Sequence, residues 1–347
     1  MAKQEVFSEF QTLKADIREK RTQRLYVFHG QEQFLLRYYL QQIKKLLIDE
    51  LTESFNYHRF TNETFNMEEF ADAVENLPMM AESTMVQVDD VDFFKFAESE
   101  REKLQQIISD IPEYCSVVFT YGIGNWKPDK RFKKLWDTVS AAAQIVEFEK
   151  QSQRDLIAWV TRHFAAAKKN ISTDLCAYLI DITDGTMTSL SGEIAKICAY
   201  SGADVIKKSD IDAVTEPVLD AVVFQMTDLM SQKRHSETMN KLNQLLKMQQ
   251  EPLSILGAVG GHFRRLATAR ILLDNGANSS ELQKLYGIGD YAARKTMDAA
   301  RRFSPVFLQK AANLVLKTDY RMKTSFDEQE RLLEMLILQL AQEAQNG

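Results

Sequence analysis

The first 150 residues alternate between short apolar runs and longer amphipathic stretches. The run at residues 25–29 is β-prone and ends at Gly30, and residues 33–49 then place apolar side chains at helical spacing. The same alternation predicts further strands at residues 55–60, 84–89, 116–121 and 143–148, and helices at residues 67–77, 98–111 and 131–142. Strands that alternate with helices are typical of a parallel, doubly wound sheet. The pattern therefore predicts an α/β domain.

From Ser152 onward the pattern contains no convincing strand. Ser152 stands where a helix N-cap is expected, and a small block of helices ends with a helix at residues 207–216. The last helix, at residues 328–344, has a dense apolar face formed by Leu332, Leu333, Leu336, Ile337 and Leu340. A face this wide indicates packing on both sides, within the domain or against another subunit. The predicted domains are therefore residues 1–150, 151–216 and 217–347.

The composition of the 347 residues is that of an ordinary globular protein, with 45% apolar and 27% charged residues. The formal net charge is −6, from 49 acidic and 43 basic residues. Proteins whose main role is to coat nucleic acid are usually basic overall. The charge therefore argues against that class and leaves any DNA contact to a local basic patch.

The cysteines support neither a zinc site nor a disulfide framework, because none stands in a CxxC pair. Each lies among apolar residues and is predicted to be a buried free thiol, as fits a reducing compartment; they are Cys115, Cys176 and Cys198. The N-terminal stretch is polar and amphipathic rather than a signal peptide. No apolar run approaches the roughly 18 residues that a membrane span needs. We expect a soluble, cytoplasmic protein without membrane contact.

The turn after the first strand is where an α/β domain of this kind would hold a nucleotide. A P-loop needs glycines for close backbone approach, a Lys for the phosphates and a Ser or Thr for magnesium. Residues 30–36 contain one glycine, Gly30, with no Lys and no hydroxyl side chain, and they place Glu32 beside the helix start. Asp89 superficially resembles a magnesium ligand at a strand end, but without a P-loop the metal has no nucleotide to hold. We predict no cofactor, no metal and no catalysis by this chain.

The histidines offer no catalytic arrangement either. They lack the spacing of a metal site or a catalytic triad, and neither GxSxG nor HExxH occurs. We predict that each is a surface or half-buried structural residue; they are His29, His58, His163, His235 and His262.

The segment between the second predicted helix and the third strand is apolar where a turn is expected. Pro78 should end the helix near Leu77, so Met79 and Met80 project from a helix end or a turn. Apolar residues in such a place either pack under the next strand or are presented to a partner. The flexible thioether of Met suits the second use because it fits irregular pockets. The residues alone favour packing in the core.

Several stretches match one known family, in order along nearly the whole chain. They are Leu77-Pro78-Met79-Met80 with the Ala that follows, residues 251–257 through 262–266, and Asp319 with Lys323 ahead of the Leu-rich residues 332–340. With the three-part organisation and the degraded nucleotide turn, they make the chain resemble the delta subunit of the bacterial DNA polymerase III clamp loader. The resemblance implies an AAA+-like parallel-sheet domain, a helical lid domain and an all-α collar domain for oligomerisation. AAA+ lids often carry an Arg three residues after a Gly at a helix start, and here that position is Thr188.

The same resemblance implies how the chain acts. In that family two bulky apolar residues plug a hydrophobic pocket on the ring-shaped sliding clamp (beta), which assigns clamp binding to Leu77, Pro78, Met79 and Met80. Aromatic or Leu residues are more usual in the pair, so Met-Met departs from the commonest pattern. The resemblance also implies that the chain opens the clamp for loading on primed DNA while the gamma/tau subunits hydrolyse ATP. The collar would assemble with those subunits and with delta prime.

A basic cluster interleaved with aromatic residues follows the fourth predicted strand. Its cations are Lys127, Lys130, Arg131, Lys133 and Lys134, and its aromatics are Trp126, Phe132 and Trp136. Such a cluster can follow a phosphate backbone. It can equally be a solvated helix face that its aromatics anchor to the sheet, and this second interpretation is favoured.

Residues 285–295 resemble the hairpin of a helix-hairpin-helix motif, in which a GxG turn and the next helix N-terminus bind phosphate. Here the glycines are Gly287 and Gly289. The alternative function is therefore a direct DNA-binding protein of repair or replication. The acidic net charge and the lack of a second hairpin favour an ordinary helix connection instead.

Overall fold

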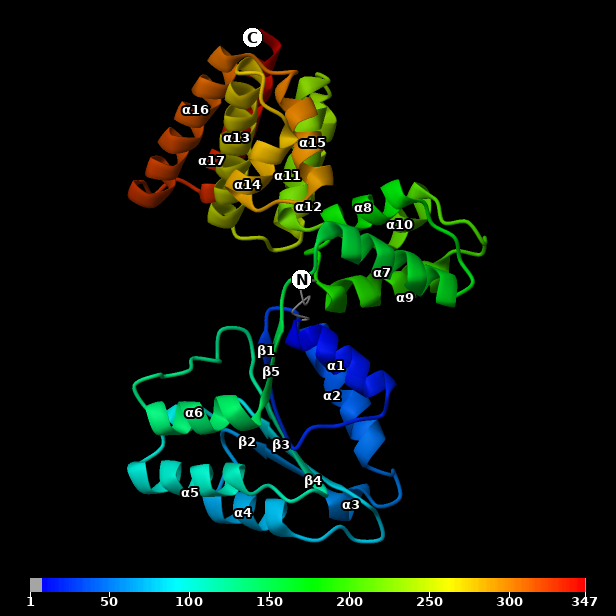
Figure 1. The fold of residues 1–347 in the computed structure, drawn as a ribbon. Coiled ribbons are helices and arrows are strands. Elements are labelled where there is room, and N and C mark those ends of the chain that lie inside the picture. Colours follow the sequence, from blue (N-terminus) through cyan, green and yellow to red (C-terminus); the bar gives the residue numbers. More distant parts are fainter. Residues whose placement is uncertain (1–7, 347) are drawn as a thin grey trace, which may run out of the picture. The chain divides into compact units, whose positions relative to one another are not determined.

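The computed structural model describes residues 8–346, and the chain divides into two compact units, Met1–Gln151 and Ser152–Gly347 (Figure 1). In the described part of the chain, no helix is both long and apolar enough to cross a membrane. Each unit is described by itself below.

The first unit is built on a five-stranded sheet in the order β2-β3-β4-β1-β5. Its strands are β1 Leu25–Gly30, β2 Tyr57–Thr61, β3 Thr84–Asp89, β4 Cys115–Thr120 and β5 Gln144–Phe148. All four neighbouring pairs are parallel; in the centre, Val27 is in register with Phe119 on β4 and with Ile145 on β5. Both faces of the sheet are covered, as parallel strands require. The predicted parallel, doubly wound sheet is confirmed.

Helices cover the two faces of this sheet in separate layers (Figure 1). They are α1 Glu9–Arg18, α2 Gln33–Leu47, α3 Glu53–Asn56, α4 Met67–Glu75, the 3₁₀ turn η1 Phe93–Lys95, α5 Glu98–Ser109 and α6 Lys133–Ala142. On one face, α1 and α2 contribute Leu13 and Ile43 to a core with Phe28 of the sheet. On the other, α4 and α5 contribute Phe70 and Leu104 to a separate core.

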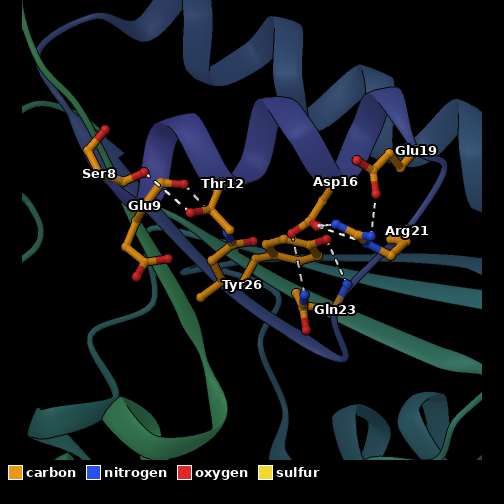
Figure 2. Close-up of polar contacts among 9 residues, drawn as sticks. Ser8, Glu9, Thr12, Asp16, Glu19, Arg21, Gln23 and Tyr26 are labelled. Atoms are coloured by element: carbon orange, nitrogen blue, oxygen red, sulfur yellow. Dashed lines mark hydrogen bonds and ion pairs between the residues drawn. The ribbon is translucent and has the colours of Figure 1, made fainter. Parts of the chain in front are cut away.

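A buried carboxylate fastens the segment between α1 and β1, as Figure 2 shows. Asp16 is 4% exposed and accepts hydrogen bonds from Arg21 Nε and Nη2, at 3.1 and 2.9 Å, and from Gln23 Nε2 at 3.5 Å. The Gln23 amide donates to the Tyr26 hydroxyl at 2.7 Å, and burial raises the pKa of Tyr26 to about 12. This cluster joins the end of α1 to the first residues of the sheet.

Two predicted element ends near α4 are wrong. The strand predicted at residues 55–60 begins only at Tyr57, because Phe55 and Asn56 are helical and their amides donate to the Thr52 carbonyl. The helix predicted at residues 67–77 ends at Glu75, where Tyr114 Oη donates to the Glu75 carbonyl at 2.8 Å. The restriction that Pro78 places on the preceding residue also opposes a helical Leu77. The first error falls where a short local helix precedes the strand, and the second where a long-range contact and Pro78 end the helix.

The second unit is helical, as predicted. Its helices are α7 Gln153–Ala166, α8 Thr173–Ile182, α9 Met187–Tyr200, α10 Lys208–Val214, α11 Leu219–Ser231, α12 His235–Lys247, α13 Pro252–Asp274, α14 Ser279–Tyr286, α15 Asp290–Ala300, α16 Pro305–Thr324 and α17 Gln329–Asn346. Ser152 caps α7 by accepting a hydrogen bond from the Asp155 amide. One apolar core joins α11 to α17 and buries the predicted face of the last helix. The boundary at 216/217 stays a prediction.

Two predictions about single side chains in this unit are wrong. Cys198 is half-buried rather than buried, unlike Cys176. His262 is 2% exposed rather than superficial, because the face of α13 that bears it packs between Phe224 and other core residues. Within residues 8–346, His262 Nε2 has no hydrogen-bond partner.

Candidate functional site

The turn between α4 and β3 exposes apolar side chains. Leu77 is 74% exposed, Met79 54% and Met80 93%, while Pro78 is half-buried. Packing in the core, which the residues alone favour, is therefore wrong for both methionines. A single exposed apolar residue is ordinary, but three within four positions form a surface that a partner can cover.

A buried asparagine holds this turn from a distant part of the chain. Asn56 is fully buried, and its Oδ1 accepts from the Met79 amide at 2.7 Å while its Nδ2 donates to the Met79 carbonyl at 2.9 Å. The same Nδ2 donates to the Thr52 carbonyl at 3.2 Å. Sequence reasoning missed this residue, because its partner lies 23 positions away and no local pattern marks the pair.

The backbone of the turn is constrained at further points. Met80 has a φ of +54°, a left-handed conformation that costs a non-glycine residue about 1–2 kcal/mol. At the two ends, Tyr114 donates through its hydroxyl to the Glu75 carbonyl, and its own carbonyl accepts from the Thr84 amide at 2.8 Å. The methionines are thus exposed on a main chain that is hydrogen-bonded to the body of the unit.

The turn after β1 differs from a phosphate-binding loop in its contacts as well as in its residues. Gly30 has a φ of +132°, and a Cβ built on it would lie 2.3 Å from the Phe148 carbonyl oxygen. The Glu32 side chain accepts from the Phe34 amide, so a carboxylate stands at the start of α2, where a phosphate would otherwise be favoured. Gln33 Nε2 donates to the Gly30 carbonyl at 2.9 Å.

The carboxylate of Asp89, at the end of β3, is also occupied by interactions within the chain. Asp89 pairs with Arg59 at 2.7 Å, and it accepts from Gln87 Nε2 and Thr120 Oγ1 at 2.7 and 2.5 Å. Among residues 8–346, no group of three or more His, Cys, Asp or Glu side chains is arranged to hold a metal ion.

The basic cluster lies on an exposed loop and the first turn of α6. Lys127, Lys130, Arg131, Lys133 and Lys134 are all exposed. The helix predicted from residue 131 begins only at residue 133, so just the last two of these cations belong to it. Arg131 pairs with Asp129 at 2.6 Å, and these hydrogen bonds lower the pKa of Asp129. Trp126 packs against Tyr121, with 4.8 Å between ring centroids, and anchors the loop.

The glycine turn at residues 287–289 is closed by a side chain from α7. Gly287 ends α14 with a φ of +63°, and Gly289 is the N-cap of α15. Gln153 Oε1 accepts from the Tyr291 amide at 3.2 Å, and a Cβ at Gly289 would lie 2.5 Å from this oxygen. The helix N-terminus that would bind phosphate in a helix-hairpin-helix motif is therefore covered, and Asp290 adds a negative charge beside it.

Comparisons with known proteins agree on one family. The family model described as "DNA polymerase III, delta subunit" matches residues 26–149, and that of the "DNA polymerase III delta subunit, C-terminal domain" matches residues 220–340. The DNA polymerase III subunit delta of Bacillus subtilis is 24% identical over 322 residues, covering 91% of this chain and 92% of that protein. The probable DNA polymerase III subunit delta of Aquifex aeolicus is 22% identical over 287 residues, covering 80% of each.

A solved structure extends the likeness to the fold. The Bacillus subtilis DNA clamp loader delta protein matches with a TM-score of 0.57 and 23% identity, over 96% of this chain and 99% of that one. This likeness in fold agrees with the predicted order of a parallel-sheet α/β domain followed by helices. The exposed turn at residues 77–80 lies inside the first matched segment and the glycine turn inside the second.

Proposed function

The chain belongs to the DNA polymerase III delta subunit family, whose two models match most of its length, and on this premise we propose that it binds a ring-shaped sliding clamp. The binding residues are Leu77, Pro78, Met79 and Met80. The observation behind the proposal is that apolar side chains are exposed, up to 93% for Met80, on a turn whose backbone is hydrogen-bonded in place. The proposed occupant of this surface is the hydrophobic pocket of the clamp.

The physical chemistry of the turn suits this role. Burying each apolar side chain contributes about 1.5–3 kcal/mol, and adjacent anchors that fill one pocket form a binding hot spot. Binding would not have to order the turn, because Asn56 already holds the Met79 main chain. A surface fixed before binding loses less conformational entropy on association.

The proposed consequence of binding is that one clamp interface opens, so that the clamp can be loaded on primed DNA. This chain would not supply the energy by hydrolysing ATP. In support, residues 30–36 lack a Lys and a hydroxyl group, and Glu32 occupies the start of α2. ATP hydrolysis would take place in the gamma/tau subunits. An isothermal titration that detected ATP binding to the purified chain at micromolar affinity would contradict this part of the proposal.

Assembly with gamma/tau and delta prime is assigned to the collar, residues 217–347, beyond a lid at residues 151–216. In support, α16 exposes two apolar side chains one helical turn apart, Leu316 at 67% and Tyr320 at 69%. Such a pair can be covered by a neighbouring helix of another subunit.

Clamp binding is tested with the purified chain and its cognate clamp. The wild type should bind, and Met79→Ser/Met80→Ser should bind at least about 100-fold more weakly while its circular dichroism stays unchanged. The matched control is Leu316→Ser/Tyr320→Ser, which removes another exposed pair of large side chains, from α16, and should leave clamp binding intact. A wild type that binds no clamp would overturn the proposal.

A second, weaker contact is proposed between the basic cluster and the phosphate backbone of primed DNA. In support, the five cations of the cluster are exposed, the first turn of α6 has no acidic residue, and its N-cap Phe132 makes no side-chain cap hydrogen bond. The positive end of the helix dipole therefore adds to the charge of Lys133 and Lys134. DNA affinity that falls with rising salt would support this contact. A chain that binds primed DNA but no clamp would instead favour the direct DNA-binding alternative.

A further inference from the structure

We propose that Asn56 is a positioning residue of the clamp-binding turn. Its buried side-chain amide holds the main chain of Met79, and through it sets Met79 and Met80 on the surface in the arrangement that the clamp pocket receives. The inference rests on the proposed clamp-binding function and adds a residue outside the turn to it.

The first argument is the chemistry of the contact. The Asn56 amide both accepts from the Met79 amide, at 2.7 Å, and donates to the Met79 carbonyl, at 2.9 Å. A side-chain amide matches this pair of main-chain groups because it presents one acceptor and two donors in a plane. Aspartate would offer no donor to the two carbonyls that Asn56 Nδ2 reaches, those of Met79 and Thr52. Alanine would leave the polar groups of Met79 without this partner.

The second argument is that side-chain packing cannot fix the turn. Leu77, Met79 and Met80 are 74%, 54% and 93% exposed, so they make few contacts that would hold the backbone. The residue after the contact, Met80, has a left-handed φ of +54° that L-residues adopt only under constraint. Hydrogen bonds to the main chain must therefore maintain the conformation, and Asn56 supplies two of them beside Met80.

The third argument is the rigidity of the group that holds the turn. Asn56 is fully buried and ends α3, directly before β2, whose Tyr57 is in register with Met85 of β3. The Asn56 side-chain amide is therefore held in place by its position next to the sheet. Without the hydrogen bonds from Asn56, the turn would have to lose backbone freedom each time it entered the clamp pocket, and the affinity for the clamp would fall.

The experiment compares Asn56→Ala and Asn56→Asp with a variant of a second asparagine, Asn66, at the start of the helix that leads into the turn. Asn66 caps the start of α4, where its Oδ1 accepts from the Glu68 and Glu69 amides at 2.8 and 3.2 Å, at the end opposite the turn. Asn66→Ala should lower stability, as the loss of a cap does, and change clamp affinity less than about twofold. The Asn56 variants should bind the clamp at least about tenfold more weakly, a change of about 1.4 kcal/mol. Wild-type affinity in folded Asn56 variants, or an equal loss in Asn66→Ala, would overturn the proposal.

Amide hydrogen exchange separates this proposal from the clamp-binding proposal. In the wild type, the Met79 amide should exchange at least about tenfold more slowly than in an unstructured peptide, and this protection should be lost in Asn56→Ala, which removes the acceptor of the Met79 amide, but kept in Asn66→Ala. If the wild type binds no clamp, the proposed function fails while the exchange result still decides whether Asn56 positions the turn. A wild-type Met79 amide that exchanges at the unstructured rate would overturn the role of Asn56, even if no variant folds.

Discussion

The turn after β1 and the turn before β3 belong to the same α/β unit and differ in what they leave for a partner. At the first turn, Glu32 caps α2 and Gln33 bonds the Gly30 carbonyl, so the groups that could hold a phosphate are used within the chain. At the second turn the main chain is also held, through Asn56, but the side chains of Met79 and Met80 remain exposed. The difference indicates that hydrogen bonds within the unit can occupy the polar groups of one turn and, in another turn, fix the main chain while its side chains stay exposed.

The largest expected effect is a loss of stability from a substitution in the turn after β1. Gly30→Ala places a Cβ 2.3 Å from the Phe148 carbonyl oxygen at a φ of +132°, which should lower the free energy of unfolding by about 3 kcal/mol or more. Urea unfolding measures this loss. Gly124→Ala is the matched control, because Gly124 also has a positive φ, +75°, but no described atom lies within 4 Å of its Cβ position; it should cost about 1–2 kcal/mol. Equal losses would refute the close contact.

The role of the turn before β3 is tested by a single substitution at Met80. Met80→Ser should weaken clamp binding by roughly 10- to 100-fold, the equivalent of burying one large apolar side chain. Its free energy of unfolding should change by less than about 0.5 kcal/mol, because Met80 is 93% exposed. Met80→Leu, which keeps an apolar side chain of similar size, should stay within about threefold of the wild type. Titration against labelled clamp measures the affinity, and urea unfolding measures the free energy of unfolding. If Met80→Leu weakened clamp binding as much as Met80→Ser, insertion of the Met80 side chain into an apolar pocket would be contradicted.

A third prediction concerns His262, whose buried Nε2 has no hydrogen-bond partner among residues 8–346. Burial, helped by the charges of Arg265 and Lys295, lowers the pKa of His262 from 6.5 to about 3. Between these values the unfolded chain binds a proton that the folded chain does not, so stability rises with pH across this window. This term should lower the stability of the helical unit by about 2 kcal/mol from pH 7 to pH 5. Urea unfolding at each pH should show that the free energy of unfolding of His262→Leu falls less between pH 7 and pH 5 than that of the wild type. An equal fall in both proteins would contradict the role of His262 in this pH dependence.

The smallest expected effect concerns the basic cluster. Lys133→Gln/Lys134→Gln should weaken binding of duplex-containing primed DNA by a few-fold and reduce the slope of log affinity against log salt by about 1.8, if both cations contact phosphates. Clamp binding should not change, since these residues lie outside the proposed clamp-binding turn. Lys241→Gln/Lys247→Gln on α12 is the matched control for a loss of two positive charges. An unaltered salt slope in the α6 variant would remove the cluster from the DNA contact.

Much of the fold followed from local pattern. The strand at residues 84–89 has the predicted bounds, and the parallel sheet and the helical second unit were both predicted from periodicity. Apolar spacing indicates these elements because each must bury one face or stripe, whatever its partner. Element ends are predicted less well where a short helix precedes a strand, as at Tyr57, or where a long-range contact ends a helix, as at Glu75.

The sequence by itself determined that a turn with Met79 and Met80 follows α4 and that the turn after β1 lacks the residues of a P-loop. Both depend on residue type and order alone. Only the tertiary structure decided that the methionines are exposed, that Asn56 holds Met79 from 23 positions away, and that Gln153 covers the N-terminus of α15. Burial and long-range hydrogen bonds depend on which segments pack together, and that information is absent from the local spacing of residues.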